Sequence, residues 1–133
     1  MAVVSSENVP IKSEPDVVTV RRRVREVSSQ LGLSLVDQTK IITAASELAR
    51  NTIIYGGGGS MQIQTLNGPR VGLRLTFEDQ GPGIPDVELA LRDGFTTGSG
   101  LGLGLGGSKR LVNEFDIVSR PGEGTRITIT RWK

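Results

Sequence analysis

The chain has 133 residues and a net charge of +2, which fits one domain with a buried core and does not indicate nucleic-acid binding. It contains neither Cys nor His, which excludes disulfides, thiolate chemistry, imidazole metal ligands and a phosphohistidine intermediate on this chain. No apolar run approaches the ~20 residues of a membrane span, and no secretory signal is recognisable, so we expect a cytoplasmic protein.

The N-terminal part predicts a loose end followed by a short strand. We expect residues 1–8 to be flexible and residues 9–133 to form a single domain. The segment 9–12 has the pattern of a short edge strand, although Pro10 cannot donate a hydrogen bond to a neighbouring strand.

Two helices are predicted next. The segment 13–16, Ser-Glu-Pro-Asp, is typical of a helix start, and Gly32 is typical of a helix end. The basic run at 21–25 is interpreted as a solvated helix face rather than a binding patch. Ser34 predicts the cap of a second helix, whose broad apolar stripe indicates burial and which the four glycines 56–59 terminate.

The remaining segments alternate between strand and helix patterns. Residues 61–65 and 71–77 predict an antiparallel hairpin around Asn67-Gly68, and residues 86–91 predict a short helix. Residues 94–107 are expected to form a mobile glycine-rich lid, with a helix from about Leu103 or Leu105 to Phe115.

Two strands follow this helix, one beginning at Ile117 and one at residues 125–132, around a turn at 121–124. The complete order of elements predicts an α+β fold. It is a two-layer sandwich in which a mixed, mostly antiparallel sheet carries its helices on one face.

Three blocks suggest a nucleotide site. Glu47 and Asn51 lie four positions apart on one face of the second helix, although a solvent-exposed pair is the simpler interpretation of these two residues alone. Asp79 ends an apolar strand and precedes a loop with two glycines. The glycine-rich stretch 98–107 offers backbone N–H groups that suit phosphate oxygens, although alone it also fits a flexible surface loop.

Two familiar phosphate motifs do not fit this stretch. Residues 102–107 match G-x-G-x-x-G, but no strand directly precedes them and no βαβ unit surrounds them. A P-loop requires Lys and then Ser or Thr after the second glycine, whereas Ser108 and then Lys109 follow here.

The blocks together resemble the GHKL, or Bergerat-fold, ATP-binding family. Residues 47–51 match its N box, 79–83 its D-x-G-x-G box, 100–104 its glycine-rich box and 122–125 its last box, in the family's order. Around these boxes the chain is very similar to RsbT-type switch serine/threonine kinases of the stressosome, over about residues 8–133.

The resemblance implies roles for the residues on the metal side and around the base. Asn51 would coordinate Mg²⁺, and Glu47 would orient or deprotonate the attacking hydroxyl. Asp79 would accept a hydrogen bond from the adenine amino group. Thr125 would lie beneath the adenine, with Asp79 as a candidate partner. Gly81 and Gly83 would let the backbone approach the base.

On the phosphate side, the resemblance implies that Gly100, Gly102 and Gly104 present N–H groups to the phosphates. Lys109 would offset phosphate charge, and a solvated helix face is an equal alternative for it.

The implied function is a protein serine/threonine kinase that uses ATP and Mg²⁺ to phosphorylate STAS-domain proteins, with a PP2C-type phosphatase as a further partner. The alternative is an ATP-binding anti-sigma factor that sequesters a sigma subunit. A histidine-kinase catalytic domain is less suitable, because the chain lacks an acceptor His and a dimerisation helix that would carry it.

Overall fold

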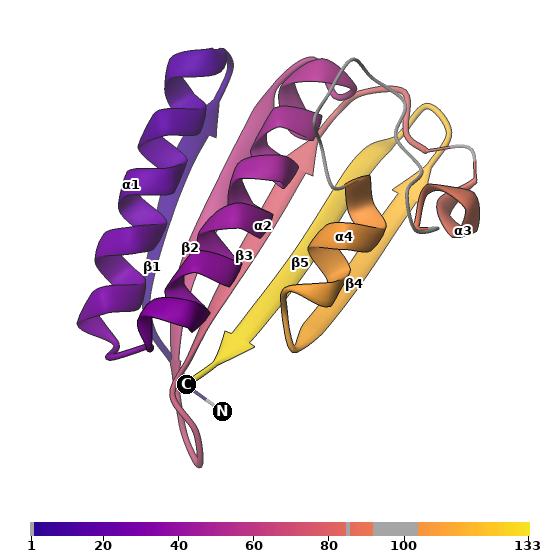
Figure 1. Ribbon diagram of the computed structural model, residues 1–133. Coiled ribbons are helices and arrows are strands. Elements are labelled where there is room, and N and C mark those ends of the chain that lie inside the picture. Colours follow the sequence, from indigo (N-terminus) through magenta and orange to yellow (C-terminus); the bar gives the residue numbers. More distant parts are fainter. Residues whose placement is uncertain (1, 85, 92–103) are drawn as a thin grey trace.

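The computed structural model describes residues 2–84, 86–91 and 104–133. The elements, in chain order, are β1 (Ala2–Ile11), α1 (Glu14–Gln30), α2 (Leu35–Ile54), β2 (Gly59–Asn67), β3 (Gly72–Asp79), α3 (Val87–Ala90), α4 (Gly104–Arg110), β4 (Glu114–Arg120) and β5 (Gly124–Trp132). The strands form one five-stranded sheet in the order β1-β2-β3-β5-β4. Helices α1, α2 and α4 lie side by side over one face of this sheet (Figure 1).

The architecture confirms the predicted α+β sandwich with helices on one face. All four strand pairings among the described residues are antiparallel, so the expected mixed sheet is here purely antiparallel. The core lies between the two layers, where the alternate residues Leu73, Leu75 and Phe77 of β3 are buried. Burial of each such side chain contributes about 1.5–3 kcal/mol.

The N-terminal segment differs from the sequence prediction. Residues 2–8, expected to be a loose end, belong to β1 and pair with β2, from Ala2 opposite Asn67 onward. Ser5 and Thr65 share a hydroxyl–hydroxyl hydrogen bond of 2.7 Å across this pair, 60 residues apart in sequence. The expected edge strand is therefore confirmed but begins earlier, because its stabilising partner lies far along the chain.

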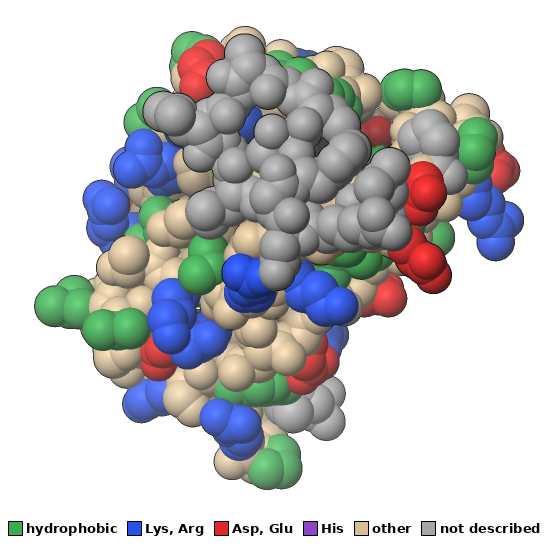
Figure 2. Space-filling model, turned by 45° about the vertical axis from the view of Figure 1, so that its right-hand side comes forward, with side chains coloured by type: hydrophobic (Ala, Val, Ile, Leu, Met, Phe, Trp, Pro, Cys, Tyr) green, Lys and Arg blue, Asp and Glu red, His purple; other side chains and the backbone are tan. Residues whose placement is uncertain are grey.

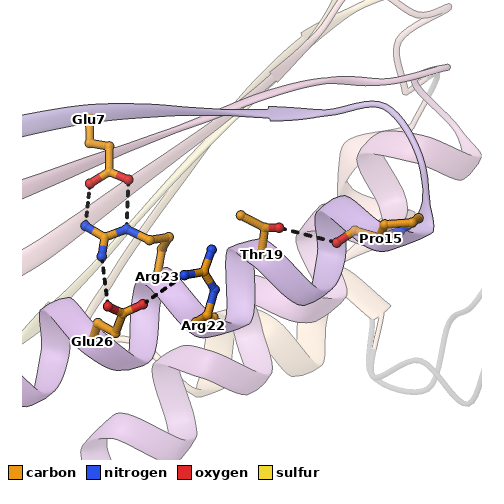
Figure 3. A network of polar contacts seen from close by, with 6 residues as sticks. All are labelled: Glu7, Pro15, Thr19, Arg22, Arg23 and Glu26. Atoms are coloured by element: carbon orange, nitrogen blue, oxygen red, sulfur yellow. Dashed lines mark hydrogen bonds and ion pairs between the residues drawn. The ribbon is translucent and has the colours of Figure 1, made fainter.

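A charged network fastens α1 to β1 (Figure 3). Arg23 donates to both carboxylate oxygens of Glu7, at 2.6 and 2.8 Å, and to Glu26 at 3.2 Å. The hydrogen bonds from Arg23 lower the pKa of Glu7 below its ordinary 4.5, and Glu7 in turn raises the pKa of Arg23. The solvated-face interpretation of the basic run is therefore wrong for Arg23, which links two elements.

A second ion pair joins the start of α2 to the last strand. Ser34 caps α2 as predicted, accepting a hydrogen bond from the Asp37 N–H at 3.1 Å. Arg131 of β5 donates to the Asp37 carboxylate at 2.6 Å and to the Leu111 carbonyl at 3.3 Å. The hydrogen bond from Arg131 holds the pKa of Asp37 below its ordinary 3.8.

The C-terminal helix ends earlier than the sequence predicts. Helix α4 stops at Arg110, and Phe115, expected at the end of this helix, lies in β4. In β4, Phe115 and Ile117 pack against the core while Glu114 and Asp116 are exposed, which is the alternation of a strand. No helix in the described ranges is long and apolar enough to cross a membrane.

Candidate nucleotide-binding site

Helix α2 carries the first pair of predicted site residues. Residues 44–49 of this helix are all buried, and Glu47 among them is only 9% exposed. Asn51 lies one turn further on and is half-buried. The interpretation of both residues as a solvent-exposed pair is therefore wrong for Glu47, whose carboxylate requires a partner inside the fold.

That partner is the backbone of the glycine-rich block. The N–H of Gly104, the first residue of α4, donates to Glu47 Oε1 at 3.4 Å. Gly104 is buried and has a φ of +69°, a conformation that favours glycine. The contact brings two blocks predicted to act together, the N box and the glycine-rich box, to one place.

Asp79 is the last residue of β3. This strand ends at the same end of the molecule as α2, near the start of α4 (Figure 1). The Asp79 Oδ1 accepts a hydrogen bond from the Gly81 N–H at 2.9 Å. A Cβ added to Gly56, in the turn after α2, would lie 2.4 Å from Asp79 Cγ. The Asp79 side chain is therefore seated against this turn, and a carboxylate retains further acceptor positions after one bond.

Close packing explains why glycines follow Asp79. A Cβ on Gly81 would lie 2.7 Å from Gly56 Cα. Gly83 has a φ of +79°, and a Cβ there would lie 2.2 Å from the Arg120 carbonyl oxygen. The loop thus packs closely on the α2 turn and on β4, and the approach of a base to it stays a prediction.

Thr125 is the direct partner of Asp79 across the β3–β5 pair. Its hydroxyl is hydrogen bonded to Ser119 Oγ at 2.7 Å. Ser119 is a residue that the sequence analysis missed. A single Ser carries no spacing signal, although strand alternation places it on the face that Phe115 and Ile117 turn toward the core.

The phosphate-side predictions are only partly within the described residues. Gly100, Gly102 and most of the expected lid lie outside them. Lys109 is exposed in the last turn of α4, whereas Gly104 begins that helix. Figure 2 shows several Lys and Arg side chains on the face that also carries the grey residues. Both interpretations of Lys109, a phosphate partner or a solvated side chain, therefore stay predictions.

The donor set suits a magnesium ion shared with phosphates. In the described ranges no three Asp, Glu, His or Cys side chains lie together as a metal site. Mg²⁺ does not need such a cage, because it commonly takes one or two protein oxygens together with phosphate oxygens and water. The half-buried carboxamide of Asn51, one turn from Glu47, can supply such an oxygen.

The chain belongs to the histidine kinase-, DNA gyrase B-, and HSP90-like ATPase family, whose model matches residues 36–133. It is 48% identical to "Serine/threonine-protein kinase RsbT" of Bacillus subtilis, covering 93% of this chain and 94% of that protein. Within the family, the chain is accordingly an ATP-dependent serine/threonine-protein kinase, as the sequence predicts.

A more distant relative is the "Anti-sigma F factor" of Thermoanaerobacter sp., 32% identical over 84% of this chain and 82% of that protein. The fold also resembles the RsbU and RsbW domains of Rv1364c from Mycobacterium tuberculosis, with a TM-score of 0.67 and 21% identity over 97% of this chain and 33% of that one. A mycobacterial sensor histidine kinase, MprB, gives a TM-score of 0.56 at 21% identity, over 96% and 97% of the two chains. These structural matches establish the fold alone.

Proposed function

We propose that the chain transfers the γ-phosphate of Mg·ATP to Ser or Thr side chains of STAS-domain proteins, as a cytoplasmic switch that also engages a PP2C-type phosphatase. The observation that carries the proposal is the hydrogen bond between Glu47 and Gly104. It puts the carboxylate proposed to receive a proton beside the backbone proposed to bind phosphate. The 48% identity to a serine/threonine kinase supports the same reaction class.

Transfer requires a protein hydroxyl to attack the γ-phosphorus while ADP leaves. In the proposal, Glu47 orients that hydroxyl and accepts its proton as the new P–O bond forms. Asn51 would hold Mg²⁺, which would neutralise phosphate charge when bound. Since phosphoryl transfer depends mainly on position and charge, the chain needs no covalent intermediate of its own.

Asp79 and Thr125 would recognise the base. A carboxylate accepts hydrogen bonds only, so it complements the exocyclic amino group of adenine and opposes the carbonyl that guanine has at that position. The hydrogen bond from the Gly81 N–H fixes the orientation of the Asp79 carboxylate. This preorganisation reduces the entropy that binding must overcome.

A sequestering module is the second candidate. The 32% identity to an anti-sigma F factor favours it, and the residues of the ATP site do not separate the two functions. In this alternative, ATP would control the affinity for a sigma subunit, and transfer to a STAS-domain protein would be absent.

The experiment that separates them is a phosphotransfer assay. The protein is mixed with Mg·ATP labelled at the γ-phosphate and with STAS-domain proteins from the same genome. Glu47→Gln is the test variant, and Glu78→Gln, which changes an exposed carboxylate at the end of β3, is the matched control. Label on a Ser or Thr of a STAS protein, lost only in Glu47→Gln, is the expected result.

Tight ATP binding without label on any STAS protein would overturn the proposed transfer to STAS-domain proteins in favour of the sequestering module. Pull-down of sigma subunits in the presence of ATP would then be the next measurement.

A further inference from the structure

The base-binding loop, defined here as residues 81–84, is seated on the β4–β5 hairpin. The Ile84 N–H donates to Ser119 Oγ at 2.7 Å. The Gly122 N–H donates to the Pro82 carbonyl at 2.7 Å. Of these two anchors from the hairpin, Ser119 is the one made by a side chain, so it can be removed without altering the backbone.

The Ser119 hydroxyl of β4 contacts both the base-binding loop and the start of β5. It has one proton and two lone pairs, and the Ile84 N–H takes one lone pair because it can only donate. The same oxygen lies 2.7 Å from Thr125 Oγ1 and 3.3 Å from the Gly124 carbonyl. Ser119 therefore holds the base-binding loop and orients Thr125, the residue directly opposite Asp79.

We infer that Ser119 is a positioning residue for the nucleotide base, acting through the Ile84 N–H and the Thr125 hydroxyl. The inference rests on the proposed ATP site and extends it to a residue outside the family boxes. Replacing Ser119 with Ala leaves the Ile84 N–H without its acceptor and Thr125 without its partner. The loop and the threonine would then lose their fixed relation to Asp79.

The test compares Ser119→Ala with Ser119→Thr, which keeps the hydroxyl. Thr128→Ala is the control, since it removes a hydroxyl from β5 on the face opposite to the buried Ile127 and Ile129. Binding of ATP and of adenosine is measured by titration, and amide exchange at Ile84 is measured without nucleotide by NMR.

We expect Ser119→Ala to bind both ATP and adenosine about tenfold more weakly, the effect of one lost hydrogen bond. Exchange at Ile84 should accelerate in this variant, and Ser119→Thr should restore both properties. A loss for ATP without the same loss for adenosine would overturn the inference, as would wild-type affinity in Ser119→Ala. A weakening matched by Thr128→Ala would assign the effect to hairpin stability and overturn it as well.

Different results would overturn the proposed ATP site and the proposed role of Ser119. If the unaltered protein bound no ATP, the proposed function would be overturned, and the inference with it. If it bound ATP and Ile84 exchanged at the same rate with and without the Ser119 hydroxyl, the inference alone would fall.

Discussion

The carboxylate of Glu47 accepts a hydrogen bond from the backbone N–H of Gly104, 57 positions further along the chain. A buried carboxylate without a partner would destabilise the fold, so this contact reduces the cost of placing Glu47 inside. It also brings the N box and the glycine-rich box into contact. The residues proposed to act on the hydroxyl and on the phosphates thus share one location.

Replacing Glu47 with Gln should leave the fold and ATP binding nearly unchanged, because Gln keeps an oxygen that can accept from Gly104. We expect kcat for phosphotransfer to fall by about 10²–10⁴, the usual contribution of general-base catalysis. Multiple-turnover transfer of labelled phosphate at saturating substrate measures kcat, and calorimetry with ATP measures binding. A kcat close to that of the Glu78→Gln control would remove Glu47 from the chemistry.

Asp79→Asn should weaken ATP binding by about tenfold or more. The Asn oxygen can still accept from the Gly81 N–H, so its amide group would face the adenine amino group, donor against donor. Calorimetric titration with ATP checks this, with Asp116→Asn on an exposed position of β4 as the control. Equal ATP affinity in both variants would mean that Asp79 does not read the base.

Gly83→Ala should destabilise the protein more than Gly122→Ala. Both glycines have a φ of +79°, where an L residue costs about 1–2 kcal/mol. A Cβ at Gly83 would also approach the Arg120 carbonyl oxygen to 2.2 Å, whereas a Cβ at Gly122 would meet nothing within 4 Å. The difference in melting temperature between the variants isolates the steric part, and identical melting temperatures would argue against the close packing of this loop.

The fold was predictable where local patterns and tertiary contacts agree. Ser34 marks the start of α2, and the alternation at 71–77 marks β3. Residues 2–8 lack regular apolar alternation, so their sequence does not predict a strand. They form one because they pair with β2, which lies far along the chain. Phe115 fits the apolar spacing of the preceding helix as well as that of a strand, and its pairing with Ile129 decides between them.

The sequence indicates which residues of the candidate site carry useful chemistry, but it does not reveal the tertiary contacts that hold them. Glu47 stands out as a carboxylate within an apolar helical stretch, and Asp79 stands out as a carboxylate at the end of an alternating strand and before a glycine-containing loop. The sequence does not reveal that Gly83 packs on the Arg120 carbonyl or that Ser119 holds the Ile84 N–H, because both contacts arise from tertiary structure.

The ion pair between Asp37 and Arg131 should make the folding stability of the protein depend on pH. The pKa of Asp37 is lowered in the folded state, so its stabilisation is present above the ordinary carboxyl pKa and is lost as the pH falls through the folded value. Asp37→Asn should cost about 1 kcal/mol at pH 7, and the difference from the unaltered protein should shrink below about pH 4. Thermal unfolding from pH 7 to pH 2 measures it.

The exposed Asp116→Asn variant provides the reference for this pH series. A destabilisation by Asp37→Asn that stayed constant down to pH 2 would mean that the charge of Asp37 is not what stabilises the start of α2.

The most direct test of the nucleotide site is ATP affinity with and without Mg²⁺, measured by calorimetry for the unaltered protein, Asn51→Ala and the exposed-strand control Asn8→Ala. We expect Mg²⁺ to strengthen ATP binding in the unaltered protein and in Asn8→Ala, and we expect Asn51→Ala to lose this strengthening while its melting temperature is retained. An Asn51→Ala variant in which Mg²⁺ strengthens ATP binding as much as in the unaltered protein would contradict the proposed magnesium-binding role of Asn51.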